Sequence, residues 1–262
     1  MTDDRPLVPE EQKADRSWRI WASVGVVVIV VVAALVGFVL LPTAYDDGHG
    51  DPLGAGPEPA TDWMASVADA VPPTEVAWTV ATMSLLAEAD AADGEVLAAQ
   101  CAGCHGADGI AASPAFPNLA GQPASAIYKQ LRDFADGHRV SPVMVGFAQA
   151  LTDQQMADLA RFYASRDPAP FAGDAAVDAD VARLVTNGDP ARGLPACNSC
   201  HLAPGGPAGS PQLRGQPATY IAAQLTAFAD GTRGNDIYGL MRTVAALLTP
   251  TEIEQLATYY QD

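Results

Sequence analysis

The pattern Cys-x-x-Cys-His occurs twice in this chain of 262 residues, as Cys101-Ala-Gly-Cys104-His105 and as Cys197-Asn-Ser-Cys200-His201. The two copies contain all four cysteines of the sequence, so no cysteine remains for a disulfide bond with another segment. In each copy two residues separate the two cysteines, and the histidine follows directly. Each copy therefore predicts a small site with two sulfur atoms and one imidazole ring.

This spacing is typical of covalent haem c attachment. The two thiols reach the two vinyl groups of one porphyrin, and the adjacent imidazole binds the iron. A zinc site built from two Cys-x-x-Cys pairs would not need a histidine after each pair. A thioredoxin-like redox pair would not be duplicated in small helical units. The two copies predict two covalently bound haem c groups, with His105 and His201 as axial ligands.

The motifs belong to a longer internal repeat. Pro117-Asn-Leu-Ala-Gly-Gln-Pro123 recurs as Pro211-Gln-Leu-Arg-Gly-Gln-Pro217, at an offset of 94 residues. Further on, Leu151-Thr-Asp-Gln-Gln-Met156 matches Leu248-Thr-Pro-Thr-Glu-Ile253, at an offset of 97 residues. Apolar residues follow helical spacing, and neither copy has a convincing alternating strand pattern. We predict an all-α fold with two homologous domains, at 90–170 and 171–262.

Several local signals predict individual helices. Thr74 follows two prolines and should cap a helix to Ala89, whose apolar residues Val76, Val80, Met83 and Leu86 share one face. Asp189-Pro190 should start a helix that leads into the second motif. The closing helix of each repeat should bury one face, formed by Met156, Leu159, Ala160 and Tyr163 in the first and by Ile253, Leu256, Ala257 and Tyr260 in the second.

The second axial ligand of each iron is expected to be a methionine, the soft donor that raises the potential of a carrier haem. Met144 and Met241 are 97 residues apart, which is the local offset of the repeat. Met156 has Ile253 as its counterpart, so it is expected to be a core residue. The sequence thus predicts His/Met ligation at both irons.

Two histidines lie outside the motifs. His138 corresponds to Thr232 in the other repeat, and His49 precedes both domains. Both are therefore expected to be ordinary surface residues and not ligands.

The N-terminal part predicts a membrane anchor. Residues 20–41 form an uncharged, valine-rich stretch that spans about 33 Å as a helix. Four basic residues precede it, Arg5, Lys13, Arg16 and Arg19, and none follows until Lys129. This asymmetry predicts a cytoplasmic arm at 1–17, a transmembrane helix at 18–41 and a periplasmic tether at 42–89, in a bacterial inner membrane. The alternative of a cleaved signal peptide is disfavoured, because its apolar core is usually about 7 to 15 residues long.

The formal net charge of −17 excludes a nucleic-acid binder, because a phosphate backbone would be repelled. An acidic chain suits basic partners, although the acidity can equally reflect solubility alone.

The motif set resembles the dihaem cytochromes of the c4 type. The resemblance covers about residues 90 to 262 and rests on Pro-x-Leu-x-Gly-Gln, Gln-Leu, Phe-Ala-Asp-Gly-Thr-Arg and Met241-x-x-Val-Ala in the second copy. It implies two tandem class I cytochrome c domains. It also implies that the carbonyls of Pro117 and Pro211 accept the imidazole N–H of the two ligand histidines, and that Arg139 and Arg233 lie near haem propionates.

Three functions remain compatible with these features. The first is a tethered carrier that a respiratory donor such as a cytochrome bc complex reduces and that a terminal oxidase or another periplasmic reductase oxidises, with no small-molecule substrate. The second is a permanent cytochrome subunit of an oxidase or dehydrogenase complex. The third is an enzyme, such as a dihaem peroxidase or a thiosulfate-oxidising protein, which needs one iron open to substrate. Two matched methionines disfavour the third function, because both irons would be closed.

Overall fold

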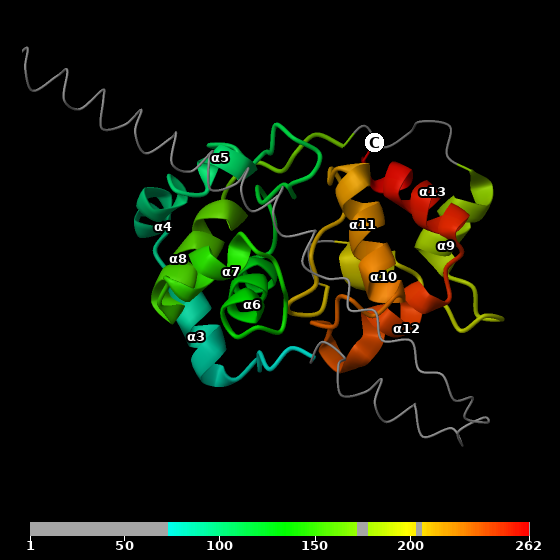
Figure 1. The fold of residues 1–262 in the computed structure, drawn as a ribbon, viewed down its shortest axis with the longest axis horizontal. Helices are drawn as coiled ribbons and strands as arrows, with labels where there is room; N and C mark the ends of the chain where they lie inside the picture. The colour runs from blue at the N-terminus through cyan, green and yellow to red at the C-terminus, as the bar shows by residue number, and fades with distance from the viewer. Residues whose placement is uncertain (1–72, 172–177, 203–205, 262) are drawn as a thin grey trace, which may run out of the picture. The chain divides into compact units, whose positions relative to one another are not determined.

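A computed structural model describes residues 73–171, 178–202 and 206–261 (Figure 1). These residues form α-helices and one short 3₁₀ helix joined by loops. They contain no β-strand, and their one isolated β-bridge joins Asp189 to Leu194. The predicted all-α character is therefore confirmed for the described residues. No helix within them is long and apolar enough to cross a membrane. The predicted arm, anchor and most of the tether fall outside these ranges, as does His49.

The two repeats have the same order of helices. The first contains α4 (Ala91–Ala98), α5 (Ala102–His105), α6 (Ala124–Ala135), α7 (Met144–Gln149) and α8 (Asp153–Ala164). The second contains α9 (Ala179–Asn187), α10 (Asn198–His201), α11 (Ala218–Ala229), η1 (Ile237–Gly239), α12 (Leu240–Ala246) and α13 (Pro250–Gln261). In each repeat the opening helix and the long middle helix both pack on the closing helix, α8 or α13. One further helix, α3 (Val80–Glu88), precedes the first repeat.

The closing helices form the centre of each core. Their predicted inward residues are all buried: Met156, Leu159, Ala160 and Tyr163 on α8, and Ile253, Leu256, Ala257 and Tyr260 on α13. Spacings of three and four residues place these side chains on one stripe of the helix, which accounts for their common burial. The prediction that Met156 is a core residue is confirmed, because its exposed fraction is 1%.

A charged capping arrangement holds the start of α13. The hydroxyl of Thr249 accepts a hydrogen bond from the N–H of Glu252, and the Glu252 carboxylate accepts one from the N–H of Thr249 at 2.8 Å. Arg192, from the loop before the second motif, donates to both oxygens of this carboxylate at 2.6 and 2.9 Å. The Arg192 guanidinium is the main reason why the pKa of Glu252 falls from 4.5 to about 2.

Glu252→Gln should lower the free energy of unfolding by about 1 to 2 kcal/mol at pH 7, because the Arg192 guanidinium then bonds to a neutral amide in place of a carboxylate. The native pKa of Glu252 is depressed, so this stabilisation is present above pH 4.5 and is lost as the pH falls towards 2. The difference between the two proteins should therefore shrink over that interval. Denaturant titrations at several pH values measure it, with Glu254→Gln, at an exposed position of the same helix, as the control.

The helix before the first repeat is shorter than the sequence predicts. It begins at Val80, and its N-cap is Thr79, whose side chain accepts from the N–H of Thr82. Thr74 is not the cap, because its hydroxyl is used in contacts with Asp133 and with the backbone of Val76. The predicted apolar face is also wrong in part. The exposed fractions of Val80 and Met83 are 85% and 48%, and only Leu86 is buried.

Two further predictions are corrected. Asp189-Pro190 starts no helix, because reciprocal backbone hydrogen bonds between Asp189 and Leu194 close a turn there instead. His138 is not a surface residue, since its exposed fraction is 8%. Its Nε2 atom lies 3.8 Å from a carboxylate oxygen of Glu75, in the segment before α3.

Candidate haem sites

Each Cys-x-x-Cys-His motif forms a single helical turn. In α5 the N–H groups of Cys104 and His105 bond to the carbonyl of Cys101 at 3.2 and 3.0 Å. In α10 the equivalent bonds to Cys197 have the same lengths. All four thiols are free and partly exposed. The turn places the two sulfur atoms of each motif on one side, with the histidine at its end.

The two histidines have the tautomer that an iron ligand needs. Nδ1 of His105 lies 3.0 Å from the carbonyl of Pro117, and Nδ1 of His201 lies 2.8 Å from the carbonyl of Pro211. A carbonyl only accepts, so each Nδ1 carries the hydrogen and the Nε2 lone pair remains available for a metal. Burial lowers the pKa of both rings and outweighs the opposing effect of the two carbonyls. Burial therefore favours a neutral imidazole at both positions, and the hydrogen bond at Nδ1 leaves Nε2 free.

The two candidate methionines occupy equivalent places. Met144 is the first residue of α7, and Met241 is the second residue of α12. Four residues after each lies a fully buried alanine, Ala148 or Ala245, which fixes the inward face of its helix. Residues four apart share a face, so both methionines lie on this inward face. Each methionine is nevertheless only half-buried.

A tyrosine from each closing helix lies beside the first cysteine of its motif. Burial raises the pKa of Tyr163, and Cys101 contributes in the same direction. Its hydroxyl is buried and has no hydrogen-bond partner among the described residues. Tyr260 occupies the equivalent place near Cys197, and its hydroxyl donates to Asn198 at 3.3 Å. In both repeats a buried tyrosine of the closing helix thus lies beside the thiol of the first motif cysteine.

The two repeats meet through a reciprocal pair of glutamines. The Gln216 side chain accepts from the N–H of Asn118 at 3.0 Å and donates to the Asn118 carbonyl at 2.6 Å. Gln122 makes the same two bonds with the backbone of Gln212, at 3.0 and 2.9 Å. Sequence reasoning did not assign these residues a role, although both glutamines belong to the duplicated Gly-Gln-Pro pattern.

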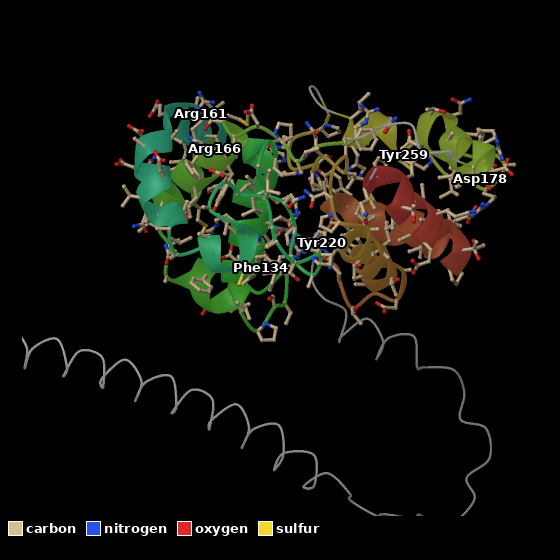
Figure 2. The ribbon with its side chains drawn as sticks, turned by 90° about the horizontal axis from the view of Figure 1, so that it is seen from above. Phe134, Arg161, Arg166, Asp178, Tyr220 and Tyr259 are labelled. Carbon is tan, nitrogen blue, oxygen red and sulfur yellow. The ribbon has the colours of Figure 1, made fainter. Side chains whose placement is uncertain are left out.

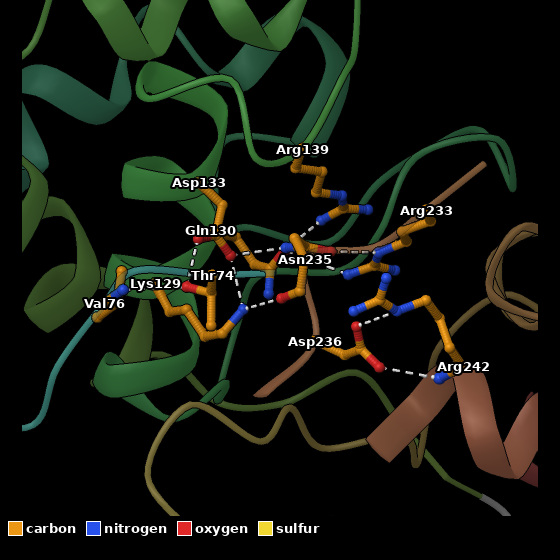
Figure 3. Close-up of polar contacts among 10 residues, drawn as sticks. All are labelled: Thr74, Val76, Lys129, Gln130, Asp133, Arg139, Arg233, Asn235, Asp236 and Arg242. Atoms are coloured by element: carbon orange, nitrogen blue, oxygen red, sulfur yellow. Dashed lines mark hydrogen bonds and ion pairs between the residues drawn. The ribbon is translucent and has the colours of Figure 1, made fainter. Parts of the chain in front are cut away.

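Arg139 and Arg233 lie together at this junction (Figure 3). Arg139 donates to its own repeat's Gln130 and to Gln224 across the junction, and Arg233 donates to the same two side chains. Each guanidinium also lies over a phenylalanine of its own repeat, at 4.7 Å in the first and 4.3 Å in the second. The acceptors that the two guanidiniums share are therefore neutral amides.

The two guanidiniums concentrate positive charge at this point, and this charge lowers two nearby pKa values. The pKa of Arg233 falls from 12.5 to about 9, first because of burial and then because of repulsion by Arg139. Burial raises the pKa of Tyr220, labelled in Figure 2, but the two guanidiniums outweigh it and the pKa is lowered overall. Two adjacent cations without a shared carboxylate suit an anionic group such as a haem propionate. The residues present therefore fit two haem c groups.

These features define the class of the protein, a c-type cytochrome whose described part is helical and carries two haem-attachment motifs. The sequence model of the family Cytochrome c matches residues 91–166. Cytochrome c4 of Pseudomonas aeruginosa is 42% identical to this chain over 179 residues, which cover 67% of this chain and 89% of that protein. The chain belongs to the cytochrome c4 family of dihaem cytochromes c.

Two further comparisons bear on fold and function. The crystal structure of reduced recombinant cytochrome c4 from Pseudomonas stutzeri matches with a TM-score of 0.61 and 38% identity, over 66% of this chain and 98% of that chain. A protein of Thiomonas intermedia named thiosulfate dehydrogenase electron acceptor is 43% identical over 169 residues, covering 62% of this chain and 77% of that protein. Membership of this family implies covalently bound haem c and a role in electron transfer.

Proposed function

We propose that this protein is a membrane-anchored dihaem carrier, which moves single electrons between redox complexes that face the periplasm. The observation that carries the proposal is the equivalence of the two sites. Each has two thiols, a histidine with a free Nε2 and a methionine on an inward face. Haem c would supply reversible one-electron chemistry here, and the histidine and methionine of each repeat would hold its iron without leaving a position for a substrate.

The protein's own residues support this role by fixing the histidine ligands and by placing charge at the junction of the repeats. The Pro117 and Pro211 carbonyls fix the orientation of the two imidazole rings. Arg139 and Arg233 supply positive charge at the junction, which favours the binding of propionates there. Fixed ligands and fixed charges keep the structural change between oxidation states small, which suits a carrier.

The proposed donor is a cytochrome bc complex and the proposed acceptor is a terminal oxidase. The net charge of −17 favours basic docking surfaces on these partners. A dehydrogenase is the second candidate donor, because the relative from Thiomonas intermedia is named as an electron acceptor of thiosulfate dehydrogenase. Purification in mild detergent distinguishes a free carrier from a permanent subunit, since only a subunit should co-elute with other chains.

The proposed location follows from the sequence. The uncharged stretch at 20–41 and the four basic residues before it support one transmembrane helix with a cytoplasmic N-terminus. Residues 42–72, rich in glycine, proline and alanine, would then carry the haem domains into the periplasm.

The native chain should fractionate with membranes, because its apolar stretch is long enough to span the hydrocarbon core. A variant in which a cleavable signal replaces residues 1–41 should instead appear in the soluble periplasm with both haems attached. Pyridine haemochrome absorbance per mole of protein measures the haem content of both forms. Recovery of the native chain in the soluble fraction would contradict the anchor, whereas one haem per chain would contradict the dihaem carrier.

A further inference from the structure

Residues 73–89 precede the part of the chain that the cytochrome c family model matches, which begins at residue 91. This segment nevertheless packs against the first repeat. Leu86 belongs to its buried core cluster, and Val76, Trp78, Leu85 and Ala89 pack at the edge of that cluster. α3 contacts α8 directly. The segment is therefore part of the folded haem unit and not only a connection to it.

The start of the segment joins a buried polar cluster at the junction of the repeats (Figure 3). The Thr74 hydroxyl donates to one carboxylate oxygen of Asp133 at 2.5 Å. The other oxygen accepts from Lys129 at 2.6 Å and from the Asn235 side chain at 2.7 Å. Lys129 also donates to the Asn235 carbonyl at 2.5 Å. The exposed fractions of Asp133, Lys129 and Asn235 are 1%, 3% and 1%. The segment, the first repeat and the second repeat thus share one network.

This ion pair belongs to the first repeat alone. The residues equivalent to Lys129 and Asp133 at the offset of 94 are Ala223 and Ala227. A buried ion pair is stabilising only when further hydrogen bonds satisfy both charges. Loss of one partner leaves the other charge buried without a counter-charge. Burial lowers the pKa of Lys129, and Asp133 acts against that shift. The pair therefore depends on Thr74 from one side and on Asn235 from the other.

Trp78 provides a direct contact between the segment and the second repeat. Gly209 has a φ of +87°, and a Cβ atom built on it would lie 2.8 Å from Cζ2 of Trp78 and 2.9 Å from Cδ of Lys129. The N–H of Gly209 donates to the hydroxyl of Ser125 in the first repeat at 3.2 Å. The backbone at Gly209 therefore lies directly against the indole ring, with no space for a side chain.

We propose that residues 73–89 act as a clamp that holds the two haem repeats in one relative orientation. α3 fixes the clamp to the first repeat through Leu86. Thr74 and Trp78 then bind at the junction, where the second repeat contributes Asn235 and Gly209. This role goes beyond the proposed carrier function, because it concerns the geometry between the haem domains and needs no particular partner.

Amide hydrogen exchange of the haem-loaded full chain tests the clamp. The N–H groups of Asn118, Gln212 and Gly209 donate across the junction, so their exchange rates report its opening. Thr74→Val and Trp78→Ala should each speed exchange at these three amides by about tenfold or more, because a buried partner or a packed ring is lost. The amides within α13 should change by less than about twofold.

Val80→Ser is the matched control, because Val80 lies on α3 with an exposed fraction of 85%. It should leave all of these exchange rates unchanged. Unchanged exchange at the junction in both clamp variants would overturn the proposal. An equal acceleration at the junction and throughout α13 would also overturn it, because that result indicates loss of stability in the second repeat and not an opened junction.

A mutant cycle provides the second test. Gly209→Ala should speed exchange at the junction in the native background, where the new methyl group meets Trp78, and should have a smaller effect in the Trp78→Ala background. Gly231→Ala is the control for backbone strain alone, because Gly231 has a φ of +79° and no heavy atom within 4 Å of the added Cβ. Its effect should be the same in both backgrounds. Equal effects of Gly209→Ala in the two backgrounds would overturn the contact with Trp78.

Discussion

Replacing Met144 or Met241 by alanine should abolish the iron–methionine absorption band of one haem and leave that of the other. The far-red band of the oxidised protein should fall to about half in each variant, because methionine is the soft axial donor in such sites. The potential of the altered haem should fall as well, since methionine favours the reduced state. Visible spectroscopy and a redox titration of each variant measure both effects.

The open coordination position gives this experiment a second readout. Each variant should bind cyanide or carbon monoxide faster than the native protein, because an accessible iron is what ligand binding requires. Met156→Leu is the matched control, because Met156 is fully buried in the core and the substitution nearly conserves volume. It should leave the spectrum unchanged. A native protein with one high-spin haem would contradict two closed irons and would favour an enzyme.

Local sequence patterns predicted those features that depend only on residues within one helical turn of each other. Each motif forms a single helical turn, and the closing helices bury the expected faces. In both cases the deciding residues lie within four positions of one another, so spacing alone fixes which side chains share a face. The repeat offset pairs Met144 with Met241, and the structure places them at equivalent points of α7 and α12.

The junction between the repeats could not be predicted in this way. Gln122 and Gln216 are duplicated, but nothing in their spacing indicates that each bonds to the backbone of the other repeat. The Lys129–Asp133 pair has ordinary i, i+4 spacing, which usually marks an exposed helix face. Its burial depends on Asn235, more than one hundred residues away. Contacts between distant segments determine the roles of these residues. Such contacts cannot be inferred from the neighbouring sequence.

The prediction that a helix starts at Thr74 is wrong for the same reason, a contact with a distant segment. Threonine after two prolines is a good N-cap by local criteria. Its hydroxyl instead donates to Asp133, where it helps to satisfy a buried carboxylate. A buried charge without enough partners is more costly than a missing cap, so the tertiary contact determines the conformation. The burial of His138 beside Glu75 is a further consequence of this segment's position.

Gly94→Ala should destabilise the first repeat by about 2 to 3 kcal/mol, although alanine is the better helix former by about 1 kcal/mol. Gly94 lies in α4 where it crosses α8. A Cβ atom there would lie 2.1 Å from the carbonyl oxygen of Asp158 and 2.8 Å from Cβ of Phe162. The nearest atoms belong to the backbone of a packed helix, so they cannot rotate away. The clash is relieved only if α4 moves away from α8, and this movement exposes part of the core.

Denaturant unfolding of the haem-loaded protein, followed by far-ultraviolet circular dichroism, measures this loss. Gly146→Ala in α7 is the matched control, because Gly146 is also helical and no heavy atom lies within 4 Å of its added Cβ. That variant should be more stable than the native protein by up to about 1 kcal/mol, since only the helix propensity changes. Opposite signs for the two substitutions are the expected result. A gain in stability for Gly94→Ala would mean that α4 does not approach α8 closely.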